Sequence, residues 1–441
     1  MPTASGAGYD GPGGLPLSIG TLVASRTGVF FGWWVVFASA AIVFLTGGTF
    51  FYGFGALFDP LVQEFGWSRA ATAFAFSLRS EVGGLAAPGV GFLVDRLGSR
   101  RLMAVGVTLV ALGFFLLSRI ETLWGFYGAV VVIAIGMSAT GGPVGMVAIA
   151  HWFRQRRGRA LAVMTMGAGA SGVMVVVLAA LISAFGWRDA LMIMAVVQLL
   201  LCVPLALSIR DRPEQLGLAA DGEISPPGTG ETGQATPFRD TEGLSVREAL
   251  RSAAFWRLSV AVALGNVGTL AIIVHQVPFF TSSVGLSRGV AAASVTAMTL
   301  MSLAGRLGFG SLADVFDKRV VMAGAYLLSG VSILLFAAIY EPWEIFIVLP
   351  LFALGFGGSI PVRPAFQAEY FGMRSFGAIQ GLVFTIATLG GLAGPVFAGW
   401  IYDVTESYRL AFVILAAGGL LAAPLVLTIP KARPRRAEVA A

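Results

Sequence analysis

Four ionisable residues interrupt the long apolar stretches of this 441-residue sequence: Arg79, Glu81, Arg306 and Arg363. A charged side chain in the middle of a membrane-spanning helix costs about 2.5–3.5 kcal/mol on insertion scales, so it needs a partner or a wet cavity. Three of the four are cations and one is an acid, which leaves an excess of positive charge. An anionic ligand is the simplest compensation for that excess, so the sequence predicts an anion-binding site.

Arg306 is the leading candidate for the anion-binding group. It precedes Asp314 by eight residues, which places it roughly 12 Å from one membrane surface at 1.5 Å per residue. Glycines at positions 305, 308 and 310 leave room around it. The planar fork of a guanidinium can hold both oxygens of a carboxylate. The alternatives are an ion pair between helices and a side chain that reaches back to the membrane surface.

Arg363 is a second candidate cation. It lies in the segment GGSIPVRP (residues 357–364), which corresponds to GGPVG (residues 141–145) in the first half of the chain. Interruptions by Gly and Pro at matching places in two halves of a membrane protein point to its binding region. The alternative is that Arg363 lies near the end of its helix and holds a gate. Two cavity cations would suit a dicarboxylate, and one would suit a monocarboxylate.

Three polar residues could line the ligand pocket. Tyr52 could form part of its wall, although an aromatic run in lipid more often serves packing or an interface belt. Asn266 and Gln380 could donate hydrogen bonds to the ligand, or they could merely join neighbouring helices.

Three further residues are candidates for proton coupling: Glu81, His275 and Arg79. Histidine titrates near neutral pH and can carry a proton, but a lone histidine is more often a simple hydrogen-bonding group. Arg79 and Glu81 are two residues apart and project about 200° apart on a helix, so they cannot both face one cavity. A structural pairing with a neighbouring helix is the alternative for both.

Two loops share a pattern about half a chain apart. The segment GFLVDRLGSRR begins at Gly91 and GSLADVFDKR begins at Gly310, and the separation of these glycines equals that of Asp95 and Asp314. We predict that both aspartates bond to the start of a neighbouring helix or to an arginine across the molecule. These contacts would form when one face of the molecule closes and break when it opens. Four basic residues accompany them as gating candidates: Arg96, Arg100, Arg101 and Arg319. The alternative is that the loops only fix topology.

The elements that position these residues must be membrane helices. The chain is 57% hydrophobic and 12% charged, with a mean hydropathy of +0.84, which excludes a soluble globule and a disordered chain. One cysteine and two histidines exclude a disulfide scaffold and a thiolate or histidine metal site, so we expect no metal and no cofactor.

Twelve apolar segments are long enough to cross a membrane, which takes about 20 residues. Their expected limits are 30–57, 69–93, 101–119, 123–150, 158–183, 188–209, 254–280, 288–313, 319–340, 343–368, 376–401 and 409–430. The repeat has a period near half the chain and contains six of these segments, which indicates two bundles in parallel topology. The predicted fold is therefore an all-α integral membrane protein with twelve transmembrane helices in two pseudo-symmetric six-helix bundles.

We expect five regions along the chain. They are a disordered tail at 1–29, a six-helix bundle at 30–209, a linker with a surface helix at 210–253, a second six-helix bundle at 254–430 and a basic tail at 431–441. With both termini on one side, 21 of the 29 Lys and Arg residues fall on that side and five on the other. The positive-inside rule then places both termini in the cytoplasm of an inner (plasma) membrane. The ratio of 27 Arg to 2 Lys favours a bacterial source.

The loop GFLVDRLGSRR resembles the signature loop of the major facilitator superfamily. In the second copy, Val315 and Asp317 replace an expected basic residue and glycine. The segments GWSRA (66–70), HWFRQRRGRA (151–160) and EYFGMR (369–374) resemble the branch of monocarboxylate transporters and oxalate:formate antiporters. The resemblance covers nearly all of residues 30–430 and implies a carrier with one central cavity.

The same resemblance implies a role for Arg306, because an arginine at its spacing before the loop aspartate binds the substrate carboxylate in that branch. The branch's antiporters are expected to carry a lysine in the eleventh span. This chain has none between Gly377 and Ile401, which argues against oxalate itself.

The expected function is secondary active transport of a small organic anion, a mono- or dicarboxylate, by alternating access with proton symport or anion exchange. The expected partners are that anion, protons and the lipid bilayer, with no nucleic acid and with the protein as a monomer. One alternative is a proton-coupled efflux pump for apolar drugs or metabolites, which fits the buried arginines less well. A membrane enzyme or receptor is a further alternative, but the sequence lacks convergent catalytic residues, so we expect no enzyme.

Overall fold

The computed structural model describes residues 30–222 and 243–431, apart from some side chains inside the helices, among them those of Tyr52 and Glu81. The expected tail at 1–29, the middle of the expected linker and nearly all of the expected tail at 431–441 lie outside the described residues.

The described first half consists of helices joined by short turns and irregular helical segments. The helices are α2 (Phe31–Gly47), α3 (Phe54–Phe65), α4 (Arg69–Leu97), α5 (Ser99–Ser118), α6 (Leu123–Thr140), α7 (Gly142–Trp152), α8 (Arg157–Ala170), α9 (Met174–Val197) and α10 (Val203–Ser208). Two π-helical turns, Gly48–Tyr52 and Gln198–Cys202, continue α2 into α3 and α9 into α10. Gly186 has a φ of 80° and turns the chain between the fifth and sixth expected spans.

The described second half is more regular. A short helix, α11 (Val246–Arg251), lies within the stretch where we expected a surface helix. It is followed by α12 (Ala253–Ser282), α13 (Arg288–Val315), α14 (Lys318–Ala337), α15 (Ile345–Phe371), α16 (Phe376–Thr405) and α17 (Arg409–Leu427). Each of these six long helices begins and ends within a few residues of an expected span.

The helix starts repeat between the halves. Ser68 caps α4 by accepting a hydrogen bond from the main-chain N–H of Ala71, and Ser287 caps α13 by accepting one from Val290. The two serines have the same separation in the sequence as the loop glycines Gly91 and Gly310. A serine at this position satisfies a main-chain donor that the first turn of a helix leaves without a partner.

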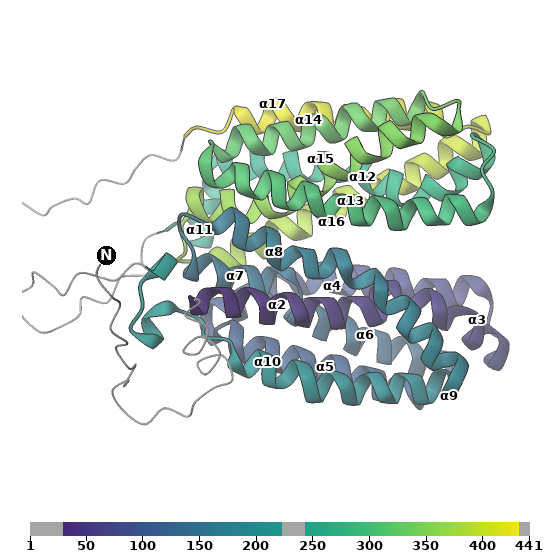
Figure 1. Cartoon of the computed structure of the whole chain (residues 1–441), viewed down its shortest axis with the longest axis horizontal. Helices are drawn as coiled ribbons and strands as arrows, with labels where there is room; N and C mark the ends of the chain where they lie inside the picture. Colours follow the sequence, from purple (N-terminus) through teal and green to yellow (C-terminus); the bar gives the residue numbers. More distant parts are fainter. Residues whose placement is uncertain (1–29, 223–242, 432–441) are drawn as a thin grey trace, which may run out of the picture.

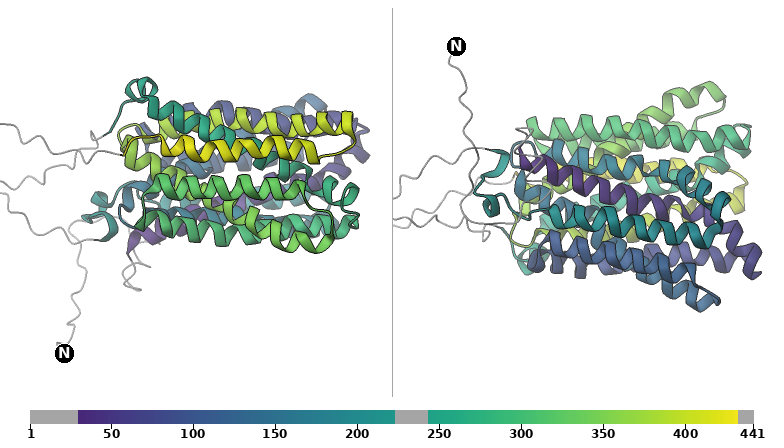
Figure 2. Two further views of the ribbon diagram at one scale, coloured as in Figure 1. Left: turned by 90° about the horizontal axis from the view of Figure 1, so that it is seen from above. Right: turned by 60° about the horizontal axis from the view of Figure 1, so that its bottom comes forward.

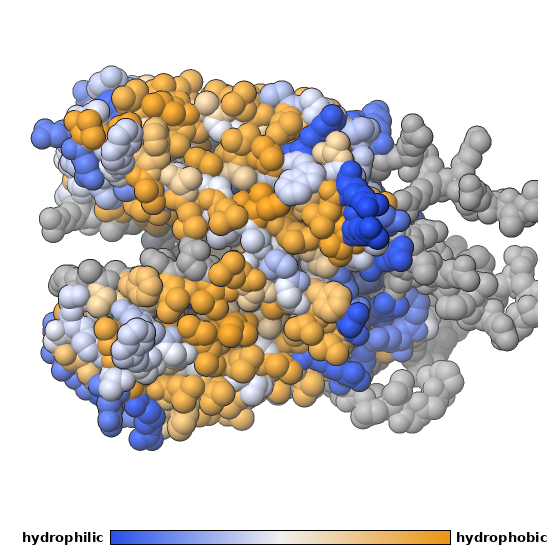
Figure 3. Space-filling view, turned by 180° about the vertical axis from the view of Figure 1, so that it is seen from behind, coloured by the Kyte–Doolittle hydropathy of each residue, from blue (hydrophilic) through white to orange (hydrophobic). Residues whose placement is uncertain are grey.

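Ten helical stretches of the described residues are long and apolar enough to cross a membrane. One of them, Arg157–Ser208, holds two expected spans, which Gly186 separates. The helix α4 is not among the ten, since Arg79 and Glu81 lower its hydropathy. Hydrophobic residues cover the sides of the molecule and hydrophilic residues gather at its ends (Figure 3). The predicted all-helical membrane fold is therefore confirmed.

The helices pack as two bundles side by side (Figure 1), and the further views in Figure 2 agree. Helices α2 to α10 form one bundle, here called the N-bundle, and α12 to α17 form the other, the C-bundle. The main contacts between them join α4 to α16 and α8 to α13. These two helix pairs therefore frame whatever lies between the bundles.

The two described parts of the linker, residues 210–222 and 243–253, contact different bundles. Asp221 accepts hydrogen bonds from the main-chain N–H groups of Arg154 and Gln155, both at 2.8 Å, on the N-bundle. Leu244 donates its N–H to the carbonyl oxygen of Phe371 at 2.7 Å on the C-bundle. We call the end of the molecule that carries these residues the linker face, and the opposite end the far face.

Candidate functional site between the bundles

The two loop aspartates form a reciprocal pair of contacts across the bundles at the linker face. Asp95 of α4 accepts hydrogen bonds from the main-chain N–H groups of Gly377 and Ala378 at 2.9 and 3.0 Å, at the start of α16. Asp314 of α13 accepts from Gly158 and Arg159 at 2.6 and 3.0 Å, at the start of α8. Each half thus caps a helix of the other half with a carboxylate, which also suits the positive end of the helix dipole.

Glycines allow the helices at these contacts to approach closely. A Cβ built on Gly91 would lie 2.2 Å from the carbonyl oxygen of Gly377, and one built on Gly158 would lie 2.0 Å from that of Gly310. Main-chain atoms cannot yield to a side chain at that distance. Gly158 and Gly377 have the same separation in the sequence as Gly91 and Gly310, so the repeat in the sequence corresponds to a repeat in the contacts.

The basic residues of the two loops make local contacts. Arg96 lies over the ring of Phe92, 4.1 Å from its centroid, and Arg101 is exposed. The main-chain N–H of Arg100 donates to Asp211 of the linker at 2.9 Å.

Arg319 pairs with Asp317 at 2.7 Å and donates to the carbonyl oxygen of Ile429 at the end of α17. It therefore ties helix ends together within the C-bundle. Asp314, by contrast, also has the cation of Arg159 at 3.7 Å across the bundles.

Arg306 lies at the interface of the bundles, eight residues along α13 from Asp314 and therefore farther from the linker face than the loop aspartates. It is 5% exposed, and its Nη1 donates to the main-chain carbonyl oxygen of Thr165 on α8 at 2.5 Å. Its guanidinium carbon would lie 3.6 Å from a Cβ on Gly169, so the absence of a side chain there makes room for it. The guanidinium is thus turned toward the opposite bundle and not toward lipid.

Arg363 lies on α15 of the C-bundle, and α15 packs against α14, which carries the buried Tyr326. Arg363 is half-buried. No acidic side chain of the described residues lies within 4.0 Å of its guanidinium. Arg363 is eight residues from the end of its helix at the linker face, and so is Tyr326. This corresponds to roughly 12 Å along the helix axis, the same distance from that face as Arg306.

Gln380 and Asn266 differ in what they join. Gln380 of α16 is buried and donates from Nε2 to the sulfur of Met146 on α7 at 3.1 Å, so it bridges the bundles. Its Oε1 is buried without a hydrogen-bond partner among the described residues. Asn266 donates to the carbonyl oxygen of Ala387 at 3.3 Å and joins α12 to α16 within the C-bundle.

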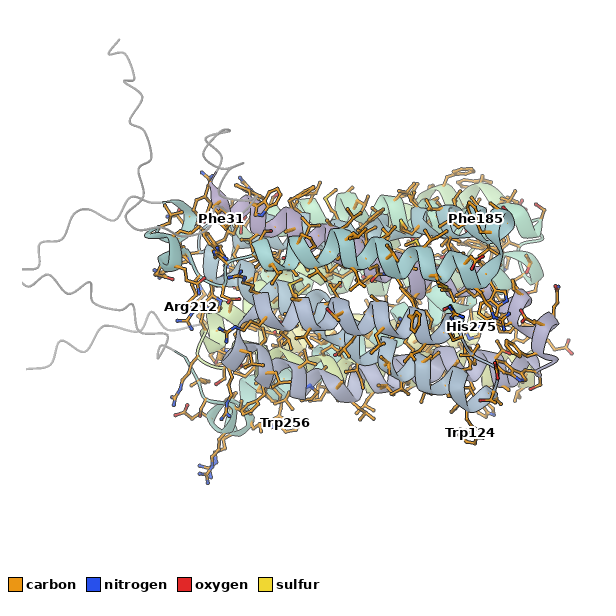
Figure 4. The ribbon with its side chains drawn as sticks, turned by 90° about the horizontal axis from the view of Figure 1, so that it is seen from below. Phe31, Trp124, Phe185, Arg212, Trp256 and His275 are labelled. Carbon is orange, nitrogen blue, oxygen red and sulfur yellow. The ribbon has the colours of Figure 1, made fainter. Side chains whose placement is uncertain are left out.

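The remaining candidates either lie away from Arg306 along the helices or have side chains outside the described residues. His275 lies toward the far face (Figure 4), with Nε2 2.9 Å from the carbonyl oxygen of Pro395 and its ring against Tyr408. Arg79 is buried in α4. Tyr52 falls in the π-helical turn after α2 and Glu81 in α4, and their side chains lie outside the described residues.

A cluster at the far face was not predicted from the sequence. Glu64 of α3 accepts hydrogen bonds from Arg188 and from Trp187 Nε1, and these hold the pKa of its carboxyl below the usual range. Arg188 also donates to the carbonyl oxygen of Ile120 at the end of α5. In the C-bundle, Arg409 does the same for Ala337 at the end of α14. The matching pairs Trp187-Arg188 and Tyr408-Arg409 were the available signal, but no repeat marks Glu64.

The contacts between bundles run from the linker face to the middle of the helices. Beyond Asp95, Thr385 of α16 donates its hydroxyl to the carbonyl oxygen of Gly84 at 2.9 Å, and Leu303 packs at Gly169. Three C-bundle residues, Ala365, Ala368 and Phe376, share a core with the N-bundle. The molecule is thus closed at the linker face.

Comparison with known proteins agrees with this architecture. A family model described as Major Facilitator Superfamily matches residues 40–308 and 268–441. A protein named Monocarboxylate transporter 13 from Bos taurus is 27% identical over 410 residues, which cover 90% of this chain and 89% of that protein. An Oxalate:formate antiporter from Oxalobacter formigenes is 24% identical over 386 residues, which cover 85% and 86%.

Solved structures share the fold. The crystal structure of the human organic anion transporter MFSD10 superposes with a TM-score of 0.66, at 17% identity, over 89% of this chain and 98% of that one. At this identity the likeness concerns the fold alone.

Proposed function

The chain belongs to the major facilitator superfamily, and we propose that its cargo is a small carboxylate held by Arg306. Membership makes the protein a multi-pass secondary transporter and not an enzyme. The observation that carries the proposal is the position of Arg306, a buried cation on α13 that reaches α8 of the opposite bundle. A ligand bound there touches both moving halves of the carrier, as alternating access requires.

The chemistry of Arg306 supports a carboxylate. Its guanidinium now donates to a neutral carbonyl oxygen, that of Thr165. A carboxylate adds an opposite charge and can accept two parallel N–H bonds from the guanidinium, which a single carbonyl oxygen cannot, so a carboxylate is the better partner. Binding would therefore exchange a contact between the bundles for a contact with the cargo. This exchange links occupancy of the site to release of the bundles.

Arg363 and Tyr326 supply a second position for an anionic group. They lie at the same depth as Arg306 but inside the C-bundle, and Arg363 has no acid of the described residues within 4.0 Å. A dicarboxylate could use both arginines, whereas a monocarboxylate would use Arg306 alone. Asn266 and Gln380 of the same bundle would supply hydrogen bonds beside them.

The names of the relatives favour the same class of cargo. The monocarboxylate transporters and the oxalate:formate antiporter match this chain over most of its length. The eleventh span has no lysine between Gly377 and Ile401, and this argues against oxalate as the cargo. We propose a small mono- or dicarboxylate other than oxalate, moved by proton symport or by exchange for another anion.

The transport cycle follows from the closed linker face. Asp95 and Asp314 hold that face shut, and we propose that the cargo then reaches Arg306 from the far face. We propose that the linker face is cytoplasmic, which the distribution of Lys and Arg supports, and that the membrane is a bacterial inner membrane, which the ratio of 27 Arg to 2 Lys supports. Breaking both aspartate contacts would open the cytoplasmic side.

Uptake into proteoliposomes tests this function. Purified protein is reconstituted and supplied with radiolabelled small mono- and dicarboxylates, with and without an imposed pH gradient and with and without unlabelled anion inside. At least one carboxylate should accumulate in vesicles with the protein and not in vesicles with Arg306→Gln. Stimulation by the pH gradient indicates symport, and stimulation by internal anion indicates exchange. Transport of an apolar cation in place of every carboxylate would reject the proposal.

A further inference from the structure

A polar cavity of about 240 Å³ lies at the linker face, apart from the Arg306 level. Three parts of the chain line it. The N-bundle contributes the end of α4 and His151 of α7, the linker contributes residues 211, 212 and 215, and the C-bundle contributes Met373 and Arg374. The cavity therefore exists only while the two bundles meet at this face.

Three of the residues that line the cavity are arginines. Arg96, Arg212 and Arg374 line it and are exposed, and Arg212 is seen at the linker end of the molecule in Figure 4. Each comes from a different part: N-bundle, linker and C-bundle. Arg374 has Glu248 at 4.0 Å, and both of those side chains are about half exposed, so that pair is weak.

The two acidic residues that line the cavity, Asp95 and Asp211, already accept hydrogen bonds from main-chain N–H groups. Asp95 accepts main-chain N–H groups from the start of α16, and Asp211 accepts the N–H of Arg100. Their charge is directed toward main-chain donors, while three arginines line the same cavity. A concave site with several arginines and engaged acids is suited to an anion that is larger than chloride.

We propose that this cavity binds a phosphate group and that bound phosphate holds the linker face closed. The guanidinium fork matches phosphate oxygens, and the cavity is lined by an arginine from each of the three parts. The group can come from a soluble phosphate ester or from a phospholipid headgroup. Because the cavity is lost when the bundles separate, the anion stabilises the closed face by the difference in its affinity for the two states. It thereby regulates the carrier from the linker side.

Thermal unfolding of the purified protein with pyrophosphate as the probe tests the soluble source. Pyrophosphate should raise the unfolding temperature in a saturable way at constant ionic strength. The double variant Arg212→Gln/Arg374→Gln should raise the half-saturating concentration by roughly a hundredfold, about tenfold for each lost charge-assisted contact. The matched control is Arg251→Gln, an exposed arginine of α11 outside the cavity, which should respond like the wild type.

Lipid nanodiscs distinguish the second source. If a phospholipid headgroup is the ligand, discs that contain phosphatidic acid should stabilise the wild type more than the double variant, and pyrophosphate should then add little. Arg306→Gln should keep the phosphate response, so failure of the proposed cargo site and failure of this site can be told apart. Equal stabilisation by sodium chloride at the same ionic strength, an unchanged response of the double variant, or loss of the response in Arg306→Gln would overturn the proposal.

Discussion

Arg306 and Arg363 differ in whether their contacts join the two bundles. Arg306 donates to Thr165 across the interface, whereas Arg363 lies on α15 of the C-bundle and makes no hydrogen bond or ion pair with the N-bundle among the described residues. Under the proposed function, a carboxylate that draws Arg306 away from α8 would loosen the interface, and a group that reaches only Arg363 would not. The two arginines are therefore expected to affect transport differently.

Arg363→Gln should separate dicarboxylates from monocarboxylates. The loss of one charge-assisted contact raises the half-saturating concentration of a transported dicarboxylate roughly tenfold, while that of a monocarboxylate changes little. Uptake kinetics in proteoliposomes with both classes measure this. A uniform loss of all transport with a lowered unfolding temperature would mean that Arg363 supports the C-bundle instead. Tyr326→Phe serves as the companion variant, since it keeps the ring and removes the hydroxyl.

His275→Gln should leave the pH dependence of uptake unchanged. The ring nitrogen bonds to the carbonyl of Pro395 and the ring packs on Tyr408, so its contacts join α12 to α16 and α17. Glutamine can donate to the same carbonyl but cannot titrate. The expected cost in unfolding free energy is about 1 kcal/mol. A pH profile of uptake that flattens in this variant would instead assign His275 to proton coupling.

At this scale the sequence identifies charged residues but not their partners. Arg306 stands out because a cation in an apolar helix is costly, and its depth follows from eight residues of helical rise. Its contact with Thr165 could not be predicted, since a main-chain carbonyl has no sequence signal and the facing helix is 141 positions away. The bond from Gln380 to the sulfur of Met146 was also missed, because the two residues are 234 positions apart and a methionine is an ordinary residue of an apolar helix.

Pairs of helices, α4 with α16 and α8 with α13, form the closed face. Their spacing depends on glycines that face main-chain atoms and on carboxylates that cap the partner helix. Each feature can be altered by a single substitution, and each substitution has a matched control nearby in the chain.

Gly91→Ala should prevent full closure of the linker face. A Cβ at this position meets the carbonyl oxygen of Gly377 at 2.2 Å, whereas one at Gly89 of the same helix meets nothing within 4 Å. Gly89→Ala is therefore the matched control and should transport like the wild type. We expect Gly91→Ala to lose most of its uptake and to expose the linker face to a thiol reagent that labels a cysteine placed at Ala378. Equal uptake by the two variants would show that the helices can separate without consequence.

Asp95→Asn and Asp314→Asn should shift the carrier toward a state open at the linker face. Each change weakens charge-assisted bonds to two main-chain donors, which are worth roughly 1.5–3 kcal/mol, or at least a tenfold change in population. Spin labels at Arg101→Cys and Arg374→Cys, with Cys202→Ala, report the distance between bundles. Asp317→Asn is the control, because Asp317 pairs with Arg319 within the C-bundle. If Asp317→Asn opens the linker face as far as the other two variants, the contacts of Asp95 and Asp314 do not hold that face closed.

Helix limits were predictable because span length and capping residues fix them locally, as Ser68 and Ser287 illustrate. The π-helical turns at Gly48–Tyr52 and Gln198–Cys202 were not, since no residue type specifies them. The pairing of Glu64 with Arg188 was also missed. It depends on how far α3 extends beyond the expected end of the first span.

The whole molecule repeats its contacts as well as its sequence. Asp95 with Gly377 and Asp314 with Gly158 are one contact formed twice, once from each half of the chain. The repeat predicted two bundles, but it could not predict which face is closed. Both faces are formed by the same helices, and the balance between them depends on small free-energy differences. Only the contacts themselves show closure at the linker face.

Equilibrium binding measures whether Arg306 holds a carboxylate between the bundles. Purified wild type and Arg306→Gln are titrated with small mono- and dicarboxylates, and the rise in unfolding temperature is followed, with Arg251→Gln as control. At least one carboxylate should stabilise the wild type and the control, and Arg306→Gln should need roughly ten to a hundred times more of it. A carboxylate that stabilises Arg306→Gln at the wild-type concentration would contradict this role of Arg306.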